Sequence, residues 1–104
     1  MSAISKLEAW YSRQCNGLWE HSYGVTIGTL DNPGWIVSID LVGTKLEAVQ
    51  FSTVAVGVGA DAHPDGADWI SCKIDGHQWK GAGDQSKLER IITEFVSWAE
   101  KHDS

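Results

Sequence analysis

The sequence is poor in basic residues. It has 8 lysine and arginine residues against 14 aspartate and glutamate residues, a formal net charge of −6 for 104 residues. Nucleic-acid binding needs a basic surface that neutralises phosphates, and this composition provides no such excess. The charge therefore argues against a nucleic-acid partner. It is compatible with a basic protein partner, because opposite charges steer two proteins together.

Long hydrophobic runs and paired cysteines are also missing. No apolar stretch approaches the roughly 20 residues that span a membrane. The residues from Met1 to Glu8 lack the basic start and apolar run of a signal peptide. Cys15 and Cys72 stand far apart and form no metal-ligand pair. We therefore expect no membrane association, a cytoplasmic location and two reduced thiols.

Motifs for catalysis and cofactor binding are absent from the sequence. It contains no nucleophile motif, phosphate-binding loop or zinc signature. One loop follows the first half of a calcium loop at Asp61, His63, Asp65, Gly66 and Asp68. The second half fails, because Cys72 occupies the twelfth position, where a glutamate is required. We expect no cofactor and no bound metal, and interpret the loop as an acidic surface suited to a basic partner.

The sequence does carry an α+β pattern, which we assign to a single domain of residues 1–104. Apolar residues recur at helical spacing near both ends, at Ile4, Leu7, Trp10 and Tyr11 and at Leu88, Ile91, Ile92, Phe95, Trp98 and Ala99. The segments 5–8 and 86–89 each fit a capping box. Between them lie only strand patterns and local turns. We predict an antiparallel meander of four to five strands, flanked by an N-terminal and a C-terminal helix packed on one face.

The first predicted hairpin, within residues 19–41, is the most informative segment. Alternating apolar residues give each strand one buried face, formed by Tyr23, Val25 and Ile27 and by Trp35, Val37, Ile39 and Leu41. In the turn between them, Pro33 fixes φ and Gly34 is expected to adopt a positive φ. Further strands are expected at about 49–56, 69–74 and 77–80, the last two joined by an Asp-Gly turn at 75–76.

This segment also resembles a known family. W-E-H-S-Y-G at 19–24, T-L-D-N-P-G-W at 29–35 and I-D-L at 39–41 are similar to the immunity protein 53 family of bacterial polymorphic-toxin systems. The resemblance continues through the first helix, the link at 14–17, D-W-I-S-C at 68–72, the turn at 81–83 and the last helix, so it covers nearly the whole chain. It implies a protein that binds and neutralises a cognate toxin domain.

Three segments supply candidate partner-binding residues for such a protein. They are the entrance of the first strand, the hairpin turn and the acidic loop, with Trp19, Glu20, His21, Asp31, Asn32, Trp35, Asp61, Asp65 and Asp68. Tryptophan is enriched at interface hot spots, and rigid exposed turns make good contact points. A purely structural role also explains the first two segments and is favoured for both. Trp19 would pack under the first helix while Glu20 and His21 fix the strand entrance, and Asp31 and Asn32 would shape the turn, with Trp35 in the core.

An enzymatic alternative remains. A small hydrolase or ligand-binding protein would use a cleft formed by Glu20, His21 and Asp40, because a glutamate beside a histidine can act as an acid–base pair. Adjacent residues of an extended segment point to opposite faces, however, which separates the pair. We therefore favour a non-enzymatic binding protein with a basic toxin domain as its partner.

Overall fold

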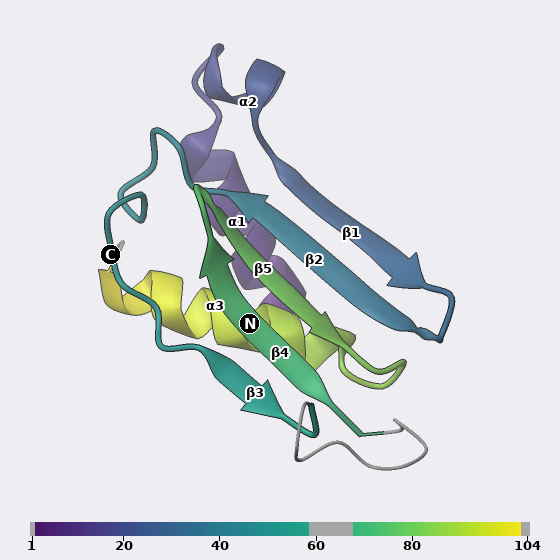
Figure 1. Cartoon of the computed structure of the whole chain (residues 1–104). Coiled ribbons are helices and arrows are strands. Elements are labelled where there is room, and N and C mark those ends of the chain that lie inside the picture. Colours follow the sequence, from purple (N-terminus) through teal and green to yellow (C-terminus); the bar gives the residue numbers. More distant parts are fainter. Residues whose placement is uncertain (1, 59–67, 103–104) are drawn as a thin grey trace.

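The computed structural model describes residues 2–58 and 68–102 and confirms the predicted α+β fold (Figure 1). Its helices are α1 Ala3–Gln14, α2 Trp19–Ser22 and α3 Leu88–His102. Its strands are β1 Val25–Leu30, β2 Gly34–Asp40, β3 Val54–Val56, β4 Ile70–Asp75 and β5 Gln78–Gly83. All the strand pairs are antiparallel. The helices α1 and α3 lie behind the sheet in Figure 1, on one of its faces.

The strands are not paired in chain order. The sheet has the order β1-β2-β5-β4-β3, so β5 is central and the chain crosses from β2 to the opposite edge. Local turn signals predicted the hairpins β1–β2 and β4–β5, but they carry no information about how two hairpins pair with each other. The strand expected at 49–56 is also shorter than predicted. Val49 and Phe51 pack against the core outside any strand.

The core lies between the sheet and the two long helices. The apolar stripe of α3 is buried as predicted, with Ile91, Ile92, Phe95, Val96, Trp98 and Ala99. Trp79, on the central strand β5, contacts Phe51 and Phe95 with ring centroids 5.7 and 5.3 Å apart. Phe95 in turn contacts Trp10 of α1 at 5.0 Å. These ring contacts join α1 and α3 to the sheet, with Trp79 of β5 at the centre of the helix–sheet contact.

Both predicted capping boxes are wrong. The N-cap of α1 is Ser2, whose Oγ accepts a hydrogen bond from the N–H of Ser5 at 3.1 Å. At the start of α3, Ser86 donates its N–H and its hydroxyl to Asp84, at 2.8 and 2.6 Å. A short polar side chain just upstream is a better acceptor in each case, because it reaches backbone N–H groups that lack a partner inside the helix.

Asp84 is a buried carboxylate, 4% exposed, that links α3 to β4. Besides Ser86, it accepts hydrogen bonds from the N–H of Trp69 at 2.9 Å and from Nζ of Lys87 at 2.7 Å. Burial alone would raise the pKa of Asp84. The hydrogen bonds from Lys87, Ser86 and Trp69 outweigh that effect and hold the pKa well below its ordinary value.

This cluster predicts an acid-sensitive contribution to stability. Because the pKa of Asp84 is lower in the folded state, the carboxylate stabilises the fold above its ordinary pKa of 3.8, and this contribution is lost as the pH falls below that value. Thermal unfolding should be measured between neutral pH and about pH 2. Over this range the melting temperature of the wild type should fall more steeply than that of Asp84→Asn.

The matched control is Asp75→Asn. Asp75 makes an exposed ion pair with Lys80 at 3.2 Å, and such a pair contributes little to stability. This variant should keep the wild-type acid dependence. If the wild type and Asp84→Asn lost stability in parallel, the role assigned to Asp84 would be wrong.

Gly34 corrects the predicted geometry of the first turn. The positive φ angles in the described ranges belong to Gly17, Gly43, Gly57 and Gly76, so Gly34 does not adopt the left-handed conformation expected of it. It is instead the first residue of β2, where a Cβ atom would collide with the carbonyl oxygen of Gly83 on β5. The position needs glycine because two backbones approach closely there.

Gly34→Val is therefore expected to lower the free energy of unfolding by ~1 kcal/mol or more, because the strands must move apart to admit the side chain. Chemical denaturation measures this loss. Gly24→Val is the control, since no atom lies within 4 Å of a Cβ at that position. Equal unfolding midpoints for the two variants would contradict the close approach.

Candidate partner-binding surface

The first strand does not bury the face predicted for it. Val25 is half-buried, whereas Tyr23 and Ile27 are exposed. On β2, by contrast, Val37 and Ile39 are fully buried as predicted. The reason is position in the sheet, because β1 is an edge strand and α3 packs over β5, β2 and β4. The apolar face of β1 therefore remains open.

An apolar groove lies between α1 and this open face. Among the described residues seven large hydrophobic side chains are exposed, and four of them, Ile4, Tyr11, Tyr23 and Ile27, line the groove. Its volume is about 490 Å³, and Leu7, Glu8, Gly24 and Val25 complete the lining. Contiguous exposed apolar surface of this kind marks an interaction site on a protein.

Trp19 packs against both tyrosines of the groove. Its ring centroid lies 6.0 Å from that of Tyr11 and 6.1 Å from that of Tyr23. The indole is buried in the core, and its Nε1 donates a hydrogen bond to the carbonyl of Val42 at 2.7 Å. Trp19 is thus unavailable as the exposed anchor considered from the sequence. Its position fixes the two exposed tyrosine rings instead.

The segment around Glu20 is a single helical turn, α2, and not the extended strand entrance that was predicted. The carboxylate of Glu20 accepts the N–H groups of Asn16 at 2.9 Å and Gly17 at 2.8 Å. The side chain of Asn16 accepts the N–H groups of Leu18 and Trp19, each at 2.9 Å. Hydrogen bonds to its own N–H and to Asn16 lower the pKa of Glu20. These bonds give the α1–α2 corner a defined shape.

The residues of the enzymatic alternative have separate structural tasks. Asp40 accepts hydrogen bonds from the N–H of Gly24 at 3.0 Å and from Nε2 of Gln78 at 2.8 Å. Glu20 is engaged by the loop, and its lowered pKa makes it a weak base near neutral pH. His21 is exposed. The groove between α1 and β1 is lined by none of these three residues.

The other candidate residues lie at the far end of the sheet. Asp31 and Asn32 are exposed in the hairpin turn, and half-buried Trp35 donates its Nε1 to the carbonyl of Gln85 at 3.0 Å. Asp68 is exposed and pairs with Lys87 at 2.6 Å. Asp61 and Asp65 lie outside the described residues.

The length of β1, about 20 Å for six residues, separates the hairpin turn from the α2 end. Figure 1 shows α2 and the hairpin turn at opposite ends of this strand. The predicted residues therefore do not form one continuous surface.

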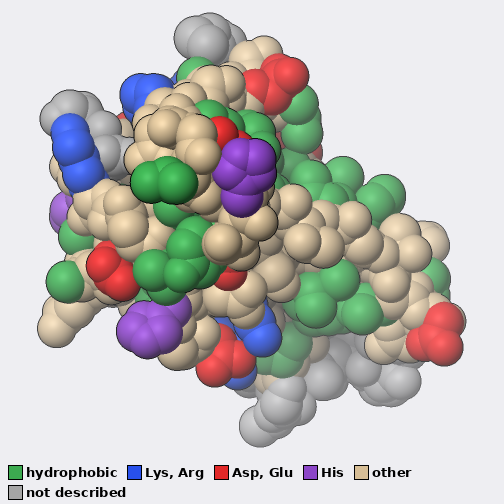
Figure 2. Space-filling view, turned by 90° about the horizontal axis from the view of Figure 1, so that it is seen from above, with side chains coloured by type: hydrophobic (Ala, Val, Ile, Leu, Met, Phe, Trp, Pro, Cys, Tyr) green, Lys and Arg blue, Asp and Glu red, His purple; other side chains and the backbone are tan. Residues whose placement is uncertain are grey.

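The lining of the groove is mainly apolar. Figure 2 views the molecule from the α2 end, and on its right side hydrophobic side chains gather, with acidic side chains at the margin and no visible lysine or arginine. The charged residue among those that line the groove is Glu8. The groove therefore suits an apolar segment that also carries positive charge.

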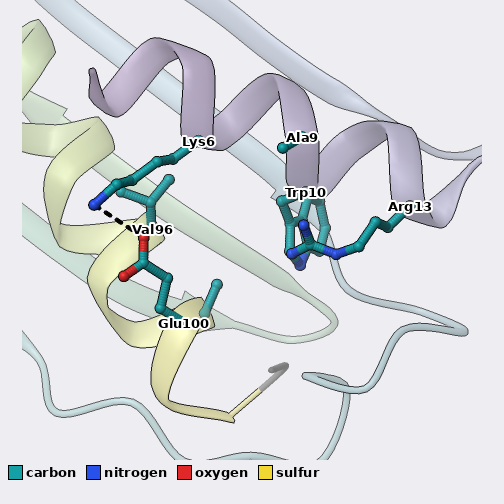
Figure 3. Close-up of a pocket in the computed structure, with 7 residues that line it drawn as sticks. Lys6, Ala9, Trp10, Arg13, Val96 and Glu100 are labelled. Atoms are coloured by element: carbon teal, nitrogen blue, oxygen red, sulfur yellow. Dashed lines mark ion pairs between the residues drawn. The ribbon is translucent and has the colours of Figure 1, made fainter. Parts of the chain in front are cut away.

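A second, smaller cavity of about 180 Å³ lies between α1 and α3 (Figure 3). Lys6 of α1 and Glu100 of α3 form an ion pair across it at 3.1 Å. Trp10 points into the same contact from α1. Because the ion pair joins the two helices, we assign this cavity to helix packing and not to binding.

Residues 2–58 and 68–102 show no metal site and no membrane-spanning helix. In these ranges no group of three or more His, Cys, Asp and Glu side chains could hold a metal ion. No helix there is both long and apolar enough to cross a membrane. Cys15 is exposed and Cys72 is buried, and burial raises the pKa of the Cys72 thiol to about 12.

Sequence reasoning assigned all four exposed groove residues to apolar faces of α1 and β1 that pack inward, and therefore missed the groove.

Neither the curated proteins nor the solved structures give a match. A protein-family model described as immunity protein 53 matches residues 4–100, which include nearly all of α1 and α3 and the whole β1–β2 hairpin. The chain therefore belongs to the immunity protein 53 family.

Proposed function

We propose that this chain neutralises a cognate toxin domain by binding it at the groove between α1 and β1. Membership of an immunity-protein family implies a toxin as partner. The observation that supports this location is the gathering of four of the seven exposed large hydrophobic side chains in one groove. The role requires binding alone, which fits the structural tasks of Glu20 and Asp40.

Tyr11 and Tyr23 are the proposed anchors of this interface. Tyrosine is enriched at hot spots because its large ring buries much area with few rotatable bonds. Both rings already contact the buried indole of Trp19. Binding would therefore cost little side-chain entropy, and the area buried around Ile4 and Ile27 would contribute to affinity.

The charge supports a basic toxin domain. The chain has a net charge of −6, and Glu8 lines the groove. Charges at the rim of an interface mainly raise the association rate and make it dependent on salt. A nuclease must bind phosphates through basic residues, so a nuclease toxin is the class that fits this charge best.

Co-expression with the toxin domain encoded by the adjacent upstream gene tests the proposal. The toxin domain alone should stop bacterial growth, and this chain should restore growth and co-purify with it. Glu20→Gln should retain the rescue, since Glu20 only organises the α1–α2 corner. Absence of rescue and of co-purification would contradict toxin neutralisation. Turnover of a small substrate that is lost in Glu20→Gln would favour the hydrolase instead.

A further inference from the structure

We propose that the toxin domain binds by adding an extended segment to the free edge of β1, as a sixth strand over the groove. This inference rests on the proposed function, because it specifies how the toxin is held. The edge strand β1 has the sequence V-T-I-G-T-L, with no charge and no proline, and pairs with β2 over six consecutive residues without a bulge. Natural edge strands are normally protected by charge, proline, bulges or short length. The opposite edge, β3, follows that rule with three residues.

The backbone of β1 offers free hydrogen-bonding groups at alternate residues. The N–H of Asp40 donates to the carbonyl of Gly24 at 3.0 Å, which identifies these two as a hydrogen-bonded pair. In an antiparallel ladder such pairs alternate with non-bonded pairs. The register therefore directs the N–H and C=O groups of Val25, Ile27 and Thr29 away from β2, towards the open edge.

The side chains of two of these residues, Val25 and Ile27, face the groove. Val25 and Ile27 are opposite Ile39 and Val37, which are buried under the helices, and both line the groove beside α1. A strand paired with β1 would place every second side chain on this face. Backbone hydrogen bonds would then supply affinity, while the groove would select the side chains, as in other cases of strand addition.

The charge identifies the occupant as a segment of the toxin domain and not a second copy of this chain. Two copies would each carry a net charge of −6 over the whole chain, and Glu8 would lie in both grooves. Like charges facing each other across an interface are unfavourable. The expected segment is extended and alternates apolar residues, with a lysine or arginine that reaches Glu8.

The pair Thr29→Pro and Thr29→Ala tests this mode of binding. Both variants lose the threonine side chain, but only proline removes the outward N–H group. The preceding residue is Gly28, which has no Cβ to clash with the proline ring. Calorimetry with the inactivated toxin domain should give at least about tenfold weaker binding for Thr29→Pro than for Thr29→Ala, with similar thermal unfolding. Equal affinities would overturn strand addition.

Amide hydrogen exchange by NMR provides the second measurement. The amides of Val25, Ile27 and Thr29 should exchange readily in the free protein and become protected in the complex. Those of Thr26 and Gly28, which face β2, should be protected in both states. Binding without new protection on β1 would refute the strand and leave toxin neutralisation standing, whereas absence of binding would refute the proposed function. A dimer of this chain that Thr29→Pro breaks, with toxin binding unchanged, would make the second copy the occupant and overturn the inference.

Discussion

Truncation of Tyr23 to alanine is expected to weaken binding to the toxin domain about 30-fold, which corresponds to a loss of ~2 kcal/mol. Tyr23 is 37% exposed and lines the groove, where its ring rests against buried Trp19. A partner that covers this ring would lose both the apolar contact and the pre-organised surface it provides. Calorimetric titration of the inactivated toxin domain measures the change.

Val56→Ala is the matched control for this experiment. Val56 is an exposed hydrophobic residue, 57% accessible, on β3 at the opposite edge of the sheet. Its truncation should leave the affinity unchanged, and thermal unfolding should confirm that both variants are folded. Equal losses in the two variants, or no loss in Tyr23→Ala, would contradict the assignment of the groove.

Trp79→Ala is expected to cause the largest loss of stability, ~3–5 kcal/mol, because it opens a cavity in the middle of the core. Trp79 is fully buried and contacts Phe51 and Phe95. A loss of this size is a large part of the total stability of a small domain, which is about 5–15 kcal/mol. Urea denaturation, with the slope held equal to that of the wild type, measures it.

Trp79→Phe separates packing from hydrogen bonding at this position. Within the part of the chain that the structure describes, the indole Nε1 of Trp79 is buried without a hydrogen-bond partner. Phenylalanine keeps an aromatic ring against Phe95 and removes no hydrogen bond, so it should cost much less than alanine. Equal losses for the two variants would show that the ring contacts do not account for the stability of the core.

The parts of the fold that could be predicted are those specified by residues close together in the sequence. The stripe of α3 repeats at helical spacing, and the alternation of Val37 and Ile39 marks the buried face of β2. The Gly76 turn joins β4 to β5 as its sequence indicated. Strand order was not predictable in this way, because it depends on which hairpins pair. That choice placed β5 at the centre and left β1 at an edge.

The groove could not be predicted for the same reason. Alternation assigns Ile27 to the helix-facing side of its strand, but burial there depends on how far the helices extend over the sheet. Ile4 and Tyr11 share the apolar face of α1 with Leu7 and Trp10, yet only the last two are buried.

The conformation of the segment around Trp19 was predicted wrongly because local side-chain hydrogen bonds determine it. Trp19, Glu20 and His21 precede an alternating strand, which suggested an extended entrance. The side chains of Asn16 and Glu20 instead satisfy four backbone N–H groups and close a helical turn. Asparagine and acidic residues stabilise such turns when they precede or begin them. The tryptophan is thereby directed into the core.

Neutralisation by direct binding is best tested by titrating the purified chain into the inactivated toxin domain encoded beside its gene. We predict a saturable one-to-one complex whose affinity falls as salt is added, because a chain with a net charge of −6 attracts a basic partner. Absence of binding at every salt concentration, together with turnover of a small substrate that depends on Glu20, would contradict toxin neutralisation.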